Sequence, residues 1–134
     1  MIVKISRETI DEIEKIASSY GLTVELFEEI GTRYSAESVK SKKLVRIRSV
    51  LDSEDFDYQF KQLSQSFQVE HSQKMFIFNL FHEIGHFELD LWKKHFGETG
   101  IAKTMGQLDN LEIDKPVNEW AYKKFTEWKE RHFS

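Results

Sequence analysis

The amino-acid sequence predicts an α+β fold, because segments with helical periodicity surround segments of strand character. Leu22 to Ile30 and Lys43 to Leu51 look like strands, and the second is rich in β-branched residues. A broad apolar pattern with helical spacing runs from about His71 to Trp92. No repeat, low-complexity tract or Pro/Gly-rich linker divides the 134 residues. We therefore expect residues 1–134 to form a single domain.

Two further helices are expected near the ends of the chain. The first should begin after Ser6, a favourable N-cap, and stop at Gly21. Its apolar face has helical spacing and consists of Ile10, Ile13, Ile16, Ala17 and Tyr20. Asp114 and Pro116 should open the last helix, because Asp caps helices and Pro is favoured in the first turn. Gly97 to Asn110 contains three Gly and predicts an extended connection.

The segment between the second strand and the long helix fits two patterns. Asp52 to Asp55 predicts a turn. In residues 56 to 69 the aromatic and aliphatic positions fit either a helical face or strand alternation. We expect a strand over at least Ser66 to Val69. The cations of Lys40 to Arg48 predict a solvated edge strand rather than a nucleic-acid site.

Composition disfavours several classes of function. The chain has no Cys, so a disulfide, a thiolate metal site and a Cys nucleophile are all excluded. A net charge of −4 gives no general attraction for nucleic acid or anionic membranes. The N-terminus lacks the apolar run of a signal peptide, and no apolar stretch is long enough to span a bilayer. We therefore expect a cytoplasmic protein that contacts no membrane and for which nucleic acid is an improbable partner.

The chemistry is concentrated in His82-Glu83-Ile84-Gly85-His86, which lies inside the long apolar helix. Residues four apart share one helix face and are about 6 Å apart along the axis, so the two imidazoles can converge on one Zn²⁺ ion. Glu83 points about 100° around the helix, which suits a general base that takes a proton from water rather than a metal ligand. The sequence thus predicts a zinc hydrolase site with His82 and His86 as ligands.

A catalytic zinc site needs a third protein ligand. The downstream carboxylates that could supply it are Glu98, Asp109, Glu112, Asp114 and Glu119. Glu119 is the preferred candidate, because it begins the last helix and a second helix often closes a site of two His and one Glu. By residue type alone, the donors that could stabilise a transition state opposite the metal are Tyr58, His71, His95 and Tyr122.

Two segments resemble the ImmA/IrrE-like zinc metallopeptidases. Residues 78–87, Phe-Asn-Leu-Phe-His-Glu-Ile-Gly-His-Phe, are similar to the F-T-x-x-H-E-x-G-H segment of that family. Residues 119–126 are similar to its second signature, E-x-E-A-N-x-F-A, with Glu119 on the first Glu and Phe125 on the Phe. The second Glu, the Ala and the Asn of that signature are replaced by Ala121, Tyr122 and Lys123.

The resemblance implies a minimal zincin-like fold: a small mixed sheet packed on a central helix that carries the H-E-x-x-H motif, with a C-terminal ligand helix. It implies a zinc metallopeptidase with a protein substrate, for which a cognate helix-turn-helix repressor of a mobile element or stress regulon is the candidate. By this match His82, His86 and Glu119 are ligands and Glu83 is the catalytic base. The alternative is a non-catalytic regulatory or toxin–antitoxin-type binding module that retains a zincin-like metal site.

Overall fold

The structure is a computed structural model that describes residues 2–28, 34–89, 101–105 and 111–133. For residues 34–35, 101–105, 111–114 and 132–133 it describes the backbone alone. In chain order the elements are β1 (Ile2–Lys4), α1 (Arg7–Ser19), β2 (Thr23–Phe27), β3 (Tyr34–Val39), the 3-10 turn η1 (Lys40–Lys42), β4 (Leu44–Arg48), β5 (Val50–Asp52), α2 (Ser53–Ser64), α3 (Lys74–Leu89), β6 (Ile101–Met105) and α5 (Leu111–Phe133). The predicted α+β class is confirmed.

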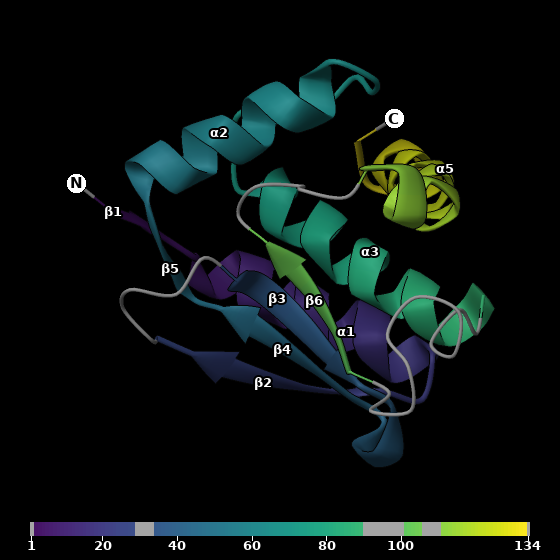
Figure 1. The fold of residues 1–134 in the computed structure, drawn as a ribbon. Coiled ribbons are helices and arrows are strands. Elements are labelled where there is room, and N and C mark those ends of the chain that lie inside the picture. Colours follow the sequence, from purple (N-terminus) through teal and green to yellow (C-terminus); the bar gives the residue numbers. More distant parts are fainter. Residues whose placement is uncertain (1, 29–33, 90–100, 106–110, 134) are drawn as a thin grey trace.

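The main sheet is small and mixed, as expected. Its four strands lie in the order β2-β4-β3-β6. β2 runs parallel to β4, whereas β3 is antiparallel to both β4 and β6. A separate antiparallel pair joins β1 to β5. Figure 1 shows α3 lying across the four-stranded sheet, with α5 on the side of α3 that faces away from the strands.

Helix α3 is the centre of the core. Every residue from Met75 to His86 is buried, which explains why its apolar pattern surrounds the helix instead of forming one narrow stripe. The helix packs on the sheet, on α1 and on α5. Its buried Asn79 exchanges hydrogen bonds with the side chain of Gln59 on α2, so the amide that interrupts the apolar run is satisfied. The segment His82 to His86 on α3 therefore lies between the sheet and α5.

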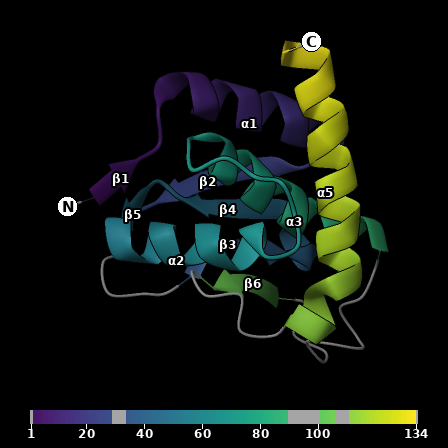
Figure 2. The same ribbon diagram turned by 90° about the horizontal axis from the view of Figure 1, so that it is seen from above.

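Gly85 permits a close approach between α3 and α5, whose axes cross in Figure 2. A Cβ atom on Gly85 would lie 3.0 Å from Cγ1 of Val117 and 3.2 Å from Cε3 of Trp120. Val117 is fully buried and so has little room to move. The small residue between the two His is thus required by the packing of α5.

We expect Gly85→Ala to lower the free energy of unfolding by about 1 kcal/mol. Helix propensity alone would favour Ala by about 1 kcal/mol, but overpacking costs about 1–3 kcal/mol at a crowded site. Urea unfolding of wild type, Gly85→Ala, Val117→Ala and the double variant measures the coupling between the two positions. The double variant should be more stable than the sum of the single changes predicts, and simple additivity would contradict the proposed contact.

The first helix agrees with its prediction, and the last helix differs at its start. Ser6 caps α1 by accepting a hydrogen bond from the Thr9 backbone N–H, and Gly21 follows the helix with φ +73°. Helix α5 begins at Leu111, three residues before the expected cap. Asp114 is therefore inside the helix, and Pro116 lies beyond its first turn. Tertiary packing of α5 on α3 outweighs the local signals.

Residues Ser53–Ser64 form a helix, where we expected a turn over Asp52 to Asp55 and where residues 56 to 69 fitted either a helix or a strand. Asp52 accepts a hydrogen bond from the Glu54 backbone N–H and so caps α2. The helical alternative is correct for Phe56, Phe60 and Leu63, but its fourth member, Phe67, lies beyond the end of α2. The strand expected over Ser66 to Val69 is absent. The buried face of α2 explains the outcome, since Phe56 and Leu63 enter the core with helical spacing.

The basic segment is also not an edge strand. Lys40–Lys42 form η1, and β4 is bonded on both sides in the sheet. Arg46 is paired with Glu25 of β2 at 3.0 Å and with Glu37 of β3 at 3.3 Å. Arg46, which looked like protection for a free edge, is instead a partner for acidic residues on the neighbouring strands.

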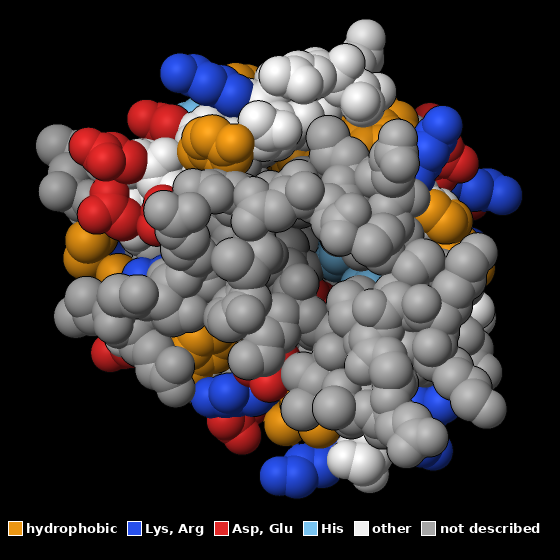
Figure 3. All heavy atoms as spheres, viewed as in Figure 1, with side chains coloured by type: hydrophobic (Ala, Val, Ile, Leu, Met, Phe, Trp, Pro, Cys, Tyr) orange, Lys and Arg blue, Asp and Glu red, His pale blue; other side chains and the backbone are white. Residues whose placement is uncertain are grey.

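The surface gives two further observations. On the face shown in Figure 3, hydrophobic side chains of the described residues form separate groups interspersed with charged ones. Within the described ranges, no helix combines the length and apolar character needed to cross a membrane. The extended connection predicted for Gly97 to Asn110 is described only over Ile101–Met105, which form β6.

Candidate metal centre

His82 and His86 meet on one face of α3, as their spacing predicts. Their Nε2 atoms are 3.3 Å apart, and the ring centroids are 5.0 Å apart with an angle of 74° between the rings. Both side chains are buried, at 1% and 0% exposure. Two convergent ring nitrogens in the interior form a donor pair, which is either joined by a hydrogen bond or held by a cation.

The spacing and donor type of this pair fit zinc. Two ligands that lie 2.0–2.1 Å from a tetrahedral ion are about 3.3–3.4 Å apart. The Nε2–Nε2 distance of 3.3 Å is that separation, so the rings would need little rearrangement to bind the ion. A hydrogen bond between the rings gives a similar distance in the metal-free protein. The distance between the two Nε2 atoms therefore agrees with either state.

The opposite nitrogen of His82 is held by α5. Its Nδ1 lies 2.7 Å from Oδ1 of Asn118, which is buried at 3% exposure. With that oxygen as acceptor, Nδ1 carries the proton and the Nε2 lone pair faces His86. Metal-binding His commonly has such a partner on its other ring nitrogen, which fixes the tautomer and the ring orientation.

Glu83 points toward the sheet. Its carboxylate is fully buried and accepts a hydrogen bond of 2.8 Å from the Ser38 hydroxyl on β3. The adjacent residues His82 and Glu83 thus face different layers, because successive residues of a helix are turned by about 100°. An ionisable group this deep in the core is unusual unless it has partners or a chemical role.

The structure does not place Glu119 beside the two imidazoles. Glu119 is exposed, whereas the preceding residue Asn118 faces α3. Among the described residues, no group of three or more His, Cys, Asp or Glu side chains is arranged to hold a metal ion. The assignment of Glu119 as third ligand thus stays a prediction that its side-chain position does not support. The alternatives Glu98, Asp109, Glu112 and Asp114 lie outside the described side chains.

The described candidates for transition-state stabilisation have other surroundings. His71 is paired with Asp57 and packs edge-on against Phe56. Tyr122 accepts a hydrogen bond from the Gln68 backbone, and Tyr58 is exposed. His95 lies outside the described residues. None of these observations assigns any of the four to the His pair.

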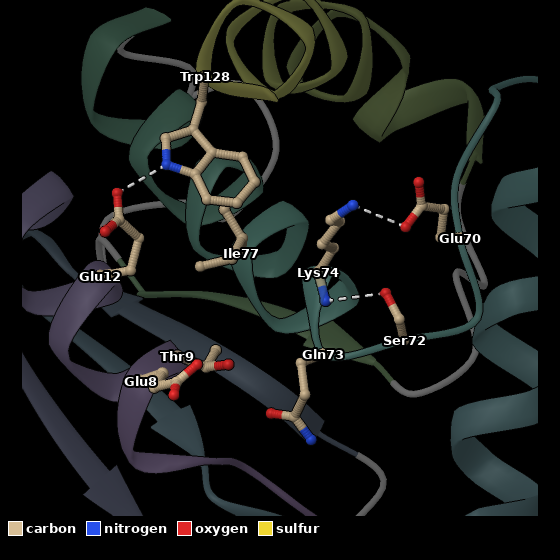
Figure 4. A pocket seen from close by; sticks show the side chains of 9 residues that line it. All are labelled: Glu8, Thr9, Glu12, Glu70, Ser72, Gln73, Lys74, Ile77 and Trp128. Carbon is tan, nitrogen blue, oxygen red and sulfur yellow. Dashed lines mark hydrogen bonds and ion pairs between the residues drawn. The ribbon is translucent and has the colours of Figure 1, made fainter. Parts of the chain in front are cut away.

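A pocket of about 550 Å³ lies at the N-terminal end of α3 (Figure 4). Residues of α1, of the segment before α3, of the first turn of α3 and of α5 line it: Glu8, Thr9, Glu12, Glu70, Ser72, Gln73, Lys74, Ile77 and Trp128. Within it Lys74 binds Glu70, and this hydrogen bond lowers the pKa of the Glu70 carboxyl. Lys74 precedes His82 by eight residues, or about 12 Å of helix. The pocket is therefore separate from the His pair, whose residues do not line it.

Sequence reasoning missed Ser38 and Asn118. Both are ordinary polar residues with no motif around them, and their importance comes from where the strand and helix meet α3. One sequence pattern could have indicated that Asn118 is buried. It lies three residues before the apolar Ala121, so both fall on one face of the helix. In the structure both residues are buried.

Comparisons of the chain with protein-family models, curated proteins and solved structures found no significant match. The resemblance of residues 78–87 and 119–126 to the ImmA/IrrE-like metallopeptidases therefore remains a prediction.

Proposed function

We propose that the protein is a zinc-dependent metallopeptidase of the ImmA/IrrE-like type that cleaves a protein partner. The observation that carries this proposal is the approach of the two buried Nε2 atoms to 3.3 Å on one helix face. A buried His pair backed by Asn118, with a buried Glu next to it in the sequence, combines metal donors and a base.

In this proposal His82 and His86 bind Zn²⁺ through Nε2. The ion supplies Lewis-acid chemistry, since it polarises a carbonyl and makes water more acidic. Glu83 accepts the proton of the attacking water and transfers it to the amine of the departing peptide. The Ser38 hydroxyl orients the Glu83 carboxylate, and burial keeps bulk water away from the reacting groups.

The proposal requires a third metal donor, because catalytic zinc sites have three protein ligands. Glu119 would have to turn from solvent toward α3 to serve. We therefore expect Glu119→Gln to change zinc affinity less than threefold, as measured by competition with a chromophoric chelator. A much larger loss would identify Glu119 as the third ligand and show that its side chain moves when zinc binds.

The expected partner is a protein, with a cytoplasmic helix-turn-helix repressor of a mobile element or stress regulon as the specific candidate. This part of the proposal rests on the resemblance of the two sequence segments. The net charge of −4 supports a protein rather than a nucleic acid as the bound molecule.

One observation favours a second candidate, a non-catalytic binding module that retains the metal site. The described side chains supply two zinc donors and not three, and Glu119 is exposed. A site with too few protein ligands would bind zinc weakly and would not position it for hydrolysis. Such a protein would bind its partner without cleaving it.

Incubation of the zinc-loaded protein with the product of the adjacent gene, and with casein as an unstructured substrate, distinguishes the two candidates. Mass spectrometry should detect new peptide termini that disappear when a chelator removes the zinc. A stable complex with both chains intact would support the binding module and contradict the peptidase.

A further inference from the structure

We infer that Asn118 is a positioning residue, which holds His82 as the Nδ1–H tautomer and so directs the Nε2 lone pair toward His86. The importance of this tautomer for metal binding rests on the proposed function. The tautomer itself is a property of the metal-free protein and can be tested separately.

The contact between Asn118 and His82 depends on how the neighbouring residues of α5 pack against α3. Its neighbour Val117 is fully buried and lies against Gly85, one turn after His82 on α3. This close approach of the two helices brings Oδ1 of Asn118 to 2.7 Å from Nδ1 of His82. Because both residues are almost completely buried, water cannot easily replace a lost hydrogen bond.

The chemistry of the two groups links the contact to the tautomer. The amide oxygen only accepts hydrogen bonds, so a neutral His82 must donate from Nδ1 to satisfy it. The other tautomer would place two lone pairs 2.7 Å apart in the interior. With Nδ1 protonated, His82 Nε2 can accept from His86 Nε2 in the metal-free protein or can bind a cation.

Asn118 also differs in role from Glu119, although the two are adjacent. Oδ1 of Asn118 contacts Nδ1 of His82, which is the nitrogen that faces away from His86. Asn118 is therefore placed to orient a metal-binding ring and not to bind the metal itself. Lys123 on the same helix is exposed, so Lys123→Gln provides a matched control.

Nitrogen-15 NMR of the metal-free protein, at a pH where His82 is neutral, tests the inference directly. We expect the Nδ1–H tautomer to dominate for His82 in wild type and in Lys123→Gln. In Asn118→Leu, which removes the acceptor at similar size, the Nε2–H form should gain population. Predominance of the Nε2–H form in wild type would overturn the inference, because the Asn118 amide would then donate through its nitrogen.

Zinc titration of the same variants adds a readout of function. Loss of a partner that orients a metal-binding His typically costs 10–100-fold in metal affinity, so Asn118→Leu should weaken zinc binding by that factor. Asn118→Asp keeps an acceptor oxygen and should therefore retain most of the zinc affinity of wild type. It also provides a second variant for the comparison if Asn118→Leu fails to fold. Equal zinc affinity in all four proteins would contradict the positioning role.

The zinc site and the positioning role of Asn118 can be contradicted independently of each other. If wild type shows the expected tautomer but binds no zinc, the metal site is wrong and the role of Asn118 in setting the tautomer stands. If zinc binds tightly while His82 is in the Nε2–H form before loading, the metal site stands and the inference about Asn118 is wrong.

Discussion

Replacing His86 with Ala should weaken zinc binding by more than 100-fold. The imidazole supplies one of the two convergent Nε2 atoms, and its removal eliminates a donor outright. Loss of a partner that merely supports a ligand already costs up to about 100-fold, so loss of the ligand itself should cost more. Competition with a chromophoric chelator, followed by measurement of bound zinc after gel filtration, gives the affinity.

His71→Ala is the matched control for that experiment. His71 is paired with Asp57 before the start of α3 and takes no part in the His82–His86 contact. This variant should bind zinc as wild type does, whereas His82→Ala should resemble His86→Ala. Equal zinc affinity for His86→Ala and His71→Ala would show that the buried pair is not the binding site.

Glu83→Gln should retain zinc and lose about 10²–10⁴-fold in kcat for peptide hydrolysis. The amide has the shape of the carboxylate, and its carbonyl can still accept the hydrogen bond from Ser38. It cannot take a proton from water, and general base catalysis is typically worth that factor. The measurement is kcat on a cleaved peptide at saturating substrate, with the zinc content determined on the same samples.

A stability measurement separates chemistry from folding in this variant. Glu83 is completely buried, so a change of charge there can alter the free energy of unfolding. Urea unfolding should show a folded protein with a cooperative transition. Wild-type kcat in folded, zinc-loaded Glu83→Gln would exclude Glu83 as the base.

Local patterns predicted helices α1 and α3, because these depend on residues close together in the chain. Ser6 and the apolar spacing after it define α1, and the apolar run before His82 defines α3. The strand pattern over Lys43 to Leu51 was less informative. That run contributes β4 to one sheet and β5 to another, with Ser49 at the junction, where it donates to Phe27 and accepts from Ile5. Such a change of partner depends on contacts far apart in the sequence.

The site shows the same division between local and distant information. The proximity of His82 to His86 follows from helix geometry and is present in the structure. The rotation of α5 does not follow from local patterns, because one residue along a helix changes the facing direction by about 100°. In the structure Asn118, and not Glu119, faces His82 on α3. The close packing of Val117 against Gly85 accompanies this rotation of α5.

X-ray absorption at the zinc edge of the loaded protein tests directly whether the buried His pair is the metal centre. We expect two imidazole ligands per zinc at about 2.0–2.1 Å, and one of them should be lost in His86→Ala. A wild-type spectrum with fewer than two imidazole ligands, or one unchanged by His86→Ala, would contradict the assignment of this buried pair as the metal centre.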